Sequence, residues 1–210
     1  DLEWFEVSTK RILRLKQKYC LFGQDFEDST AAAAVAGRTG RPEDHVMSLD
    51  HALRAVAVVA DDGTLPLTGR RALCVGPEAL LADPASGWSW LLGGTFCGAL
   101  QAADPSVIAM NYLVDGMEET AGDWVLENAP LADVVVAATF QGYFSEAQQA
   151  LMDRLIDDSG LPVVHVAQGV PFDLIQTAGR ANASVALMGS LPVMFEAGAA
   201  VLYGEADGSG

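Results

Sequence analysis

The stretch that most constrains the fold is 132–167, where two apolar runs flank a segment with helical periodicity. The runs 134–138 and 163–167 are continuously apolar, which is typical of strands covered on both faces. Between them, apolar residues recur at intervals of three and four from Phe144 to Ile156, which predicts a helix with one face on a core. This order predicts a right-handed βαβ unit with parallel strands.

The same alternation continues on both sides of this unit. It predicts strands over 72–76, 107–112, 134–138, 163–167 and 184–188, and helices over 88–100, 118–128, 145–158, 172–178 and 194–202. The helix at 88–100 has Ser86 as its candidate N-cap. We therefore expect an α/β fold, namely an open, mostly parallel sheet with helices on both faces, a three-layer sandwich of the flavodoxin-like kind.

Three regions are expected along the chain. Residues 1–22 contain a helix over 2–19 that has no core partner nearby in the sequence. Residues 23–67 are expected to form a linker, then a short helix ending near Ala55 with Ser48 or Asp50 as its cap, and then an edge strand or extended segment at 56–60. Residues 68–210 form the α/β domain. The chain does not begin with Met, so we expect it to be a piece of a longer one.

Charge narrows the choice of partners. The formal net charge is −16, and five of the twelve basic residues lie between Lys10 and Lys18. Nucleic acid and anionic membranes are therefore not expected as partners, because both would be repelled. No apolar run reaches the roughly 18 residues that a membrane span requires.

The three cysteines, Cys20, Cys74 and Cys97, are an odd set without short spacing, which does not indicate a disulfide framework or a zinc site. Cys74 lies in an apolar run and is expected to be a small buried side chain. Three unpaired cysteines favour a reducing, cytoplasmic environment, although the sequence leaves upstream signals open.

Ligands of open α/β sheets bind outside the carboxyl ends of the strands. That rule makes Asn111, Gln141, Gln168 and Asp173 the candidate ligand-binding residues. No cofactor is expected, because the chain contains neither a phosphate-binding P-loop nor G-x-G-x-x-G. No metal site is expected either.

Other candidate residues have simpler interpretations. His165 lies inside an apolar run and is interpreted as a core histidine with a satisfied hydrogen bond. Trp88 and Trp90 are expected to pack against the core, and stacking on a sugar ring is the alternative for them.

Several segments, taken in order, resemble a known family. They are 8–16 (STKRILRLK, similar to SVRRILRLK), 50–67 (DHALRAVAVVADDGTLPL, similar to SITLLKN…LPL), 132–167, 171–174 (PFDL, similar to NPYDL), and 202–205 with 208–210 (LYGE and GSG, similar to LFGE…PSG). The chain thus resembles the C-terminal α/β sandwich domain of glycoside hydrolase family 3. Residues 1–22 would then be the terminal helix of a missing (β/α) barrel domain, which would be the partner of this domain.

Two departures refine this resemblance. Family β-glucosidases insert a segment with the acid/base Glu after the third strand, whereas this chain runs directly through 139–148, TFQGYFSEAQ. This compact form is similar to the β-N-acetylhexosaminidase branch, whose catalytic residues lie on the barrel. None of the family's catalytic residues has a counterpart in this sequence, and Glu146 is not assigned as the acid/base residue. The loop before the last helix, LMGSLPVMFEA at 187–197, also differs from the family's YGFTPPSLEA.

The resemblance implies a parent enzyme that hydrolyses terminal β-linked N-acetylglucosamine, with a carbohydrate substrate and no cofactor. The chain itself would be structural and inactive. Two alternatives remain open: a non-catalytic carbohydrate-binding module, and a domain of a family 3 β-glucosidase.

Overall fold

The computed structural model describes residues 2–19, 21–22, 40–78, 94–112 and 116–210. They belong to two units, Asp1–Asp44 and His45–Gly210. The first unit contains α1 (Leu2–Lys18), which confirms the helix expected at 2–19. Its apolar side chains include Ile12 and Leu15, both of which are exposed.

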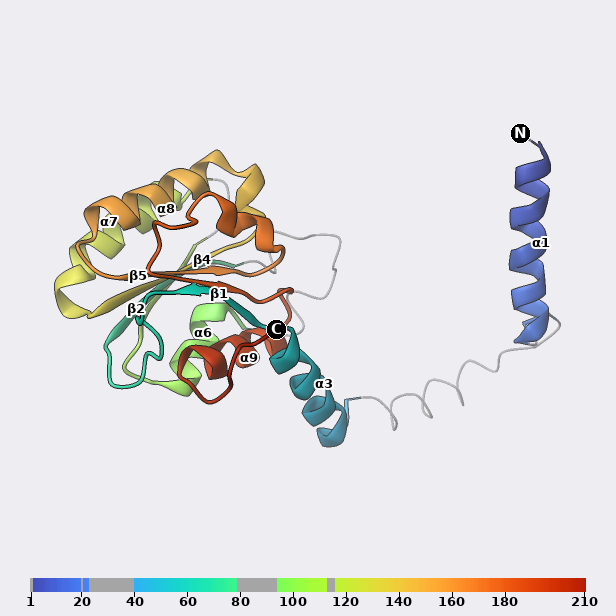
Figure 1. Cartoon of the computed structure of the whole chain (residues 1–210), viewed down its shortest axis with the longest axis horizontal. Helices are drawn as coiled ribbons and strands as arrows, with labels where there is room; N and C mark the ends of the chain where they lie inside the picture. The colour runs from blue at the N-terminus through green and yellow to red at the C-terminus, as the bar shows by residue number, and fades with distance from the viewer. Residues whose placement is uncertain (1, 20, 23–39, 79–93, 113–115) are drawn as a thin grey trace. The chain divides into compact units, whose positions relative to one another are not determined.

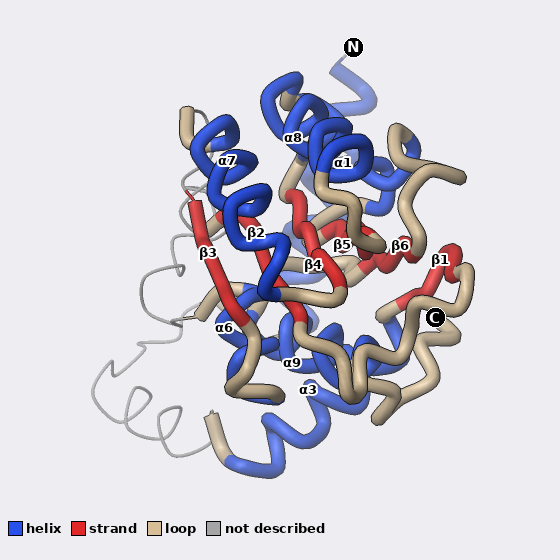
Figure 2. The backbone as a smooth tube through the Cα atoms, turned by 90° about the vertical axis from the view of Figure 1, so that its left-hand side faces the viewer, coloured by secondary structure: helices blue, strands red, loops and turns tan. Residues whose placement is uncertain are grey.

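The second unit is built on one six-stranded sheet. Its strands are β1 (Ala57–Asp61), β2 (Ala72–Pro77), β3 (Ile108–Tyr112), β4 (Val134–Thr139), β5 (Val163–Ala167) and β6 (Ala183–Ala186). Their order across the sheet is β1-β6-β5-β4-β2-β3, and Figure 2 follows it from β1 at one edge to β3 at the other. β1 pairs antiparallel with β6, and all other neighbouring strands are parallel.

Helices cover both faces of this sheet (Figure 1). α7 (Glu118–Asn128) and α8 (Glu146–Asp158) lie on one face, and α6 (Phe96–Ala103) and α9 (Pro192–Leu202) lie on the other. This arrangement confirms the expected α/β fold with a mostly parallel sheet. No described helix is long and apolar enough to cross a membrane.

The continuous apolar runs are explained by two hydrophobic clusters, one on each face. Successive residues of a strand point to opposite faces. Cys74, Val136 and Val166 therefore join the cluster under α6 and α9, whereas Val75 and Val135 join the one under α7 and α8. Each fully buried Val contributes about 1.5–3 kcal/mol, so burial on two faces is the main force that holds the sheet.

The helices on the α6 and α9 face pack closely because α9 carries a glycine at the contact. A Cβ at Gly198 would lie 2.5 Å from Leu187 Cδ2 and 3.2 Å from the Phe96 ring. The rings of Phe96 and Phe195 meet edge to face beside it, with centroids 6.1 Å apart. Gly198 therefore sets how near α9 lies to the sheet.

Two helix starts differ from the sequence prediction. α3 (Pro42–Ala55) begins six residues before Ser48, so Ser48 and Asp50 lie inside the helix and do not cap it. Pro42 at its first position suits a helix start, because proline has the right φ and lacks an N–H that would be unpaired there. α6 begins at Phe96, where the Thr95 hydroxyl accepts from Gly98 N–H. Ser86, Trp88 and Trp90 lie outside the described residues.

The compact second unit begins at His45. β1 lies at the edge of the sheet, as expected for 56–60, and its pairing with β6 ties this segment to the sheet. Ala57 also bridges to Ser209, and Val58 N–H donates to Gly208 carbonyl oxygen at 2.9 Å.

The cysteine prediction was wrong for two residues. Cys74 on β2 and Cys97 on α6 form a disulfide, with their Cα atoms 5.6 Å apart. Cys74 is buried as expected, but its partner is 23 residues away and faces it only once α6 folds onto the sheet. The argument for a cytoplasmic location from three unpaired cysteines therefore loses its basis. Cys20 lies outside the described residues.

Candidate functional site at the carboxyl edge of the sheet

A buried polar network lies where β4 and β5 end. Thr139 is the last residue of β4, His165 lies on β5, and Asp173 belongs to the short helix η4 (Pro171–Ile175) that follows β5. The Thr139 hydroxyl donates to Asp173 Oδ2 at 2.9 Å and lies 3.0 Å from His165 Nε2. On the other side of the ring, His165 Nδ1 lies 2.6 Å from the Thr177 hydroxyl. All four side chains are at most 3% exposed.

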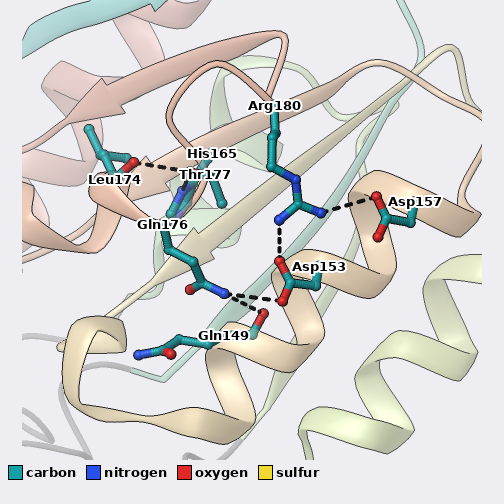
Figure 3. A network of polar contacts seen from close by, with 8 residues as sticks. All are labelled: Gln149, Asp153, Asp157, His165, Leu174, Gln176, Thr177 and Arg180. Carbon is teal, nitrogen blue, oxygen red and sulfur yellow. Dashed lines mark hydrogen bonds and ion pairs between the residues drawn. The ribbon is translucent and has the colours of Figure 1, made fainter.

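The directions of these bonds assign the tautomer of His165. Because the Thr139 hydroxyl gives its proton to Asp173, its oxygen accepts from the imidazole, which places the proton on Nε2. Nδ1 then accepts from the Thr177 hydroxyl, whose other available acceptor is the Leu174 carbonyl oxygen at 3.4 Å (Figure 3). Burial lowers the pKa of His165 to about 4, which agrees with a neutral ring. The expectation of a core histidine with satisfied hydrogen bonds is confirmed.

Asp173 joins two loops at this edge. Its Oδ1 accepts from the backbone N–H of Tyr143 at 2.9 Å, and Tyr143 lies in η3 (Gly142–Phe144), the short helix after β4. One carboxylate therefore holds the loop after β4 against the loop after β5. Hydrogen bonds to charged groups are about twice as strong as neutral ones, so this junction is rigid.

Two glutamines of α8 hydrogen-bond to the backbone of the turn between β4 and α8. The side-chain amide of Gln148 donates to Phe140 carbonyl oxygen and accepts from Phe140 N–H, both at 3.0 Å. Gln149 Nε2 donates to the carbonyl oxygens of Gly142 and Tyr143. The Ser145 hydroxyl caps α8 by accepting from Gln148 N–H at 3.3 Å. The turn is therefore held by side chains and needs no further residues to define its path.

A second set of contacts attaches the segment after η4 to α8 (Figure 3). Arg180 forms ion pairs with Asp153 and Asp157, the latter at 3.1 Å. Gln176 Nε2 donates to Gln149 carbonyl oxygen at 3.2 Å. The ion pairs are partly exposed and contribute little each, but together they hold this segment on the helix.

The structure places the four predicted ligand-binding residues differently from one another. Gln141, Gln168 and Asp173 lie together after β4 and β5, whereas Asn111 lies on β3, two strands away from β4. Gln141 is exposed and has a left-handed φ of 53°, and Asn111 is half-buried. Asp173 is 3% exposed and its two oxygens are occupied by Thr139 and Tyr143.

Gln168 is fully buried, and neither atom of its side-chain amide has a hydrogen-bond partner among the described residues. The same holds for Asn111 Oδ1. Gly76 on β2 lies between the two, where a Cβ would come within 3.5 Å of Gln168 Nε2. Ligand binding by these residues stays a prediction.

The exposed surface of this edge is aromatic. Phe144 is 79% exposed, Phe172 57% and Tyr143 52%. The ring of Tyr143 meets that of Phe144 at 88° and that of Phe172 at 58°. The sequence analysis did not single these residues out. The sequence could have indicated them, because Tyr143 and Phe144 occupy a turn, where polar residues are usual and two adjacent aromatic residues are not.

Glu146 is exposed at the first turn of α8, and it is not assigned a catalytic role. Within the described ranges, no group of three or more His, Cys, Asp or Glu side chains could hold a metal ion.

A groove lies elsewhere in the second unit. It measures about 640 Å³ and is lined by Leu49 and Leu53 of α3 and by small residues of α6 and α9. Its lining is mostly apolar, and Thr95, Glu196 and Glu205 contribute the polar side chains.

No protein-family model matches this sequence, and no curated protein does either. Solved structures do. A family 3 β-N-acetylglucosaminidase from Paenibacillus sp. str. FPU-7 superposes with a TM-score of 0.72 at 20% identity, over 98% of this chain and 38% of that one. This chain has the fold of part of a family 3 glycoside hydrolase. It spans about two fifths of the length of that enzyme.

β-Glucosidases show the same similarity. The enzyme from Listeria innocua superposes with a TM-score of 0.71 at 20% identity, over 93% of this chain and 30% of that chain. The β-glucosidase from Erythrobacter marinus gives a TM-score of 0.62 at 17% identity, over 89% of this chain and 31% of that chain. The fold is thus shared with glycosidases of two specificities, and does not by itself separate them.

Proposed function

We propose that this chain is the C-terminal sandwich domain of a family 3 glycoside hydrolase that removes terminal β-linked N-acetylglucosamine. The observation that carries the finer part of this proposal is the turn after β4. Only six residues separate Thr139, which ends β4, from Glu146, which begins α8. In the glucosidase pattern, the acid/base residue lies in an insertion at this place.

The contacts of the turn support this assignment. Its residues are bonded to Gln148, Gln149 and Asp173. An inserted catalytic segment would have to displace these bonds. The compact turn therefore favours a parent enzyme whose acid/base group lies outside this domain.

The parent would be a retaining hydrolase that forms a covalent glycosyl-enzyme intermediate. The role of the present chain would be structural, and on its own it would be inactive. The barrel domain of the same polypeptide would be its partner, and would hold the nucleophile and the acid/base group.

The test compares two proteins on two substrates. The longer polypeptide that contains this sequence should hydrolyse an aryl N-acetyl-β-glucosaminide faster than the matching aryl β-glucoside. Residues 1–210 alone should hydrolyse neither above the buffer blank. Turnover by the isolated chain would contradict the claim that it lacks catalytic groups.

A family 3 β-glucosidase is the second candidate, because the Listeria innocua enzyme is about as similar in fold. Preference of the longer polypeptide for the glucoside would favour it and would refute the N-acetylglucosaminidase assignment.

A further inference from the structure

The groove between α3, α6 and α9 has no part in the proposed function. Its volume of about 640 Å³ lies within the roughly 300–1,000 Å³ typical of small-molecule sites, which often form between packed helices. Fifteen described residues line it, whereas a stable protein interface engages about 20–30 residues on each side. The size of the groove therefore favours a small ligand over a protein.

The walls of the groove are apolar and made of short side chains. Figures 1 and 2 show α6, α9 and α3 next to one another on one side of the sheet. Glycine and alanine leave the hollow between α6 and α9: Gly98, Ala99, Ala102 and Ala103 on α6, and Ala199 and Ala200 on α9. Leu49 and Leu53 of α3 form the third wall and are half-buried. An apolar chain or ring in this hollow would be removed from water, which is favourable.

The three walls are held in place before anything binds. The disulfide of Cys97 with Cys74 ties α6 to β2. Gly198 lets α9 lie close to the sheet, as described above. His45 Nε2 lies 3.1 Å from Glu196 Oε2 and links α3 to α9. A preformed groove loses little conformational entropy when a ligand enters it.

One end of the groove is negatively charged. α6 returns the chain from β2 to β3 and α9 follows β6, so both helices run opposite to the parallel strands and end on the same side. The C-terminal end of a helix carries partial negative charge that basic residues usually balance, but neither helix has a basic residue in its last turn.

Glu205 adds a full negative charge at this end. Its backbone N–H donates to Ala200 carbonyl oxygen at 2.8 Å, which places it beside the last turn of α9. Its side chain is exposed and lines the groove, and its carboxylate has no hydrogen bond or ion pair with any described residue. Glu196 also lines the groove, but it already pairs with His45.

The surroundings strengthen the preference for a positive charge. Residues 45–210 contain 20 acidic and 5 basic side chains, and no Lys or Arg is among the described residues that line the groove. An anionic ligand, or a second copy of this acidic unit, would be repelled, and a cation would be attracted.

We propose that the α3–α6–α9 groove binds a small amphiphile with one positive charge. Its apolar chain or ring lies between α6 and α9, and its ammonium or guanidinium group pairs with the Glu205 carboxylate. A neutral sugar is not the ligand, because the alanine walls offer its hydroxyl groups no hydrogen bonds. The proposal does not rest on the proposed function, and the outcome of the hydrolysis test does not bear on it.

The test is titration calorimetry of the chain with three probes that share one octyl chain. They are n-octylammonium chloride, octan-1-ol and sodium octanoate, each below its critical micelle concentration. The ammonium should bind at one saturable site, with the alcohol about threefold weaker and the carboxylate roughly tenfold weaker. Added NaCl should weaken binding of the ammonium and leave that of the alcohol unchanged. Equal affinities would overturn the preference for a cation, and no saturable binding would overturn the site.

Two pairs of variants locate the site. Ala102→Phe fills the groove from an exposed position of α6 and should abolish binding, whereas Ala178→Phe, at an exposed residue that does not line the groove, should leave it unchanged. Glu205→Gln should weaken binding of octylammonium about threefold, and Glu146→Gln, which changes the net charge equally, should not. Melting temperatures check that all four variants fold, and the Glu205 pair decides the matter if Ala102→Phe does not. Equal effects within a pair would overturn this location.

Discussion

Asp173 is the residue whose replacement tests the carboxyl edge most sharply. In Asp173→Asn, one side-chain oxygen is exchanged for an amide N–H group. The asparagine keeps an acceptor for Tyr143 N–H, but it then presents a donor to the Thr139 hydroxyl, which already accepts from His165 Nε2–H. A hydrogen bond to a charged group contributes about 1.5–3 kcal/mol, and an unsatisfied buried donor costs about 1–3 kcal/mol.

The two effects overlap, because the same Thr139 proton is involved in both. We therefore expect the free energy of unfolding to fall by about 2–4 kcal/mol, a large share of the 5–15 kcal/mol typical of a domain. Urea denaturation followed by circular dichroism measures this change. Asp158→Asn is the matched control, since Asp158 is exposed at the end of α8 and its replacement should stay within about 0.5 kcal/mol. A value for Asp173→Asn as small as that of the control would refute the hydrogen-bond assignment.

Three further changes test other parts of the fold. Burial lowers the pKa of His165 to about 4 in the folded protein, whereas its ordinary value in the unfolded chain is near 6.5. Titration of His165 therefore leaves the free energy of unfolding unchanged above about pH 6.5 and lowers it by about 3 kcal/mol as the pH falls to 4. The free energy of unfolding, measured by urea denaturation at several pH values between 4 and 7, should therefore depend less on pH in His165→Gln than in the unaltered chain. An equal dependence on pH would contradict this. Replacing Cys74 and Cys97 by Ala opens a 23-residue loop and should cost about 3 kcal/mol, an effect that reductant reproduces in the unaltered chain but not in the variant. Gly198→Ala should cost about 1–3 kcal/mol by pushing α9 from Leu187, and a melting temperature equal to that of the unaltered chain would count against this packing.

Periodicity predicted most of the sheet because β2, β4, β5 and β6 are buried along their whole length. β5 was predicted over the residues it occupies, and β2 and β4 to within one residue, since their apolar runs end where the chain turns. The pairing of β1 was not predicted. An edge strand with one exposed end has no run that specifies its direction or its neighbour, and β1 runs antiparallel to β6, which comes more than 120 residues later.

The candidate site was predicted by position and not by role. The rule for strand ends led to Asp173 and Gln141, and both lie at the carboxyl edge. It could not tell that Asp173 is a buried junction between loops, because that depends on Thr139 and Tyr143 meeting it in space. Gln148 was noted only as a polar interruption of a helical face, although its amide pairs with both backbone groups of Phe140. The Cys74–Cys97 bond was missed for the same reason, since spacing alone does not bring α6 onto β2.

The antiparallel edge of the sheet has a consequence for synthesis on the ribosome. β1 is made early, but its partners are β6 and Ser209, near the other end of the chain. At roughly 5–20 residues per second, about 6–25 s pass between the completion of β1 and that of β6. The parallel strands β2 to β5 can associate during this interval while β1 remains without its neighbour. The first strand of this sheet to be synthesised is therefore among the last to be paired, and its unpaired edge is exposed to other chains throughout that time.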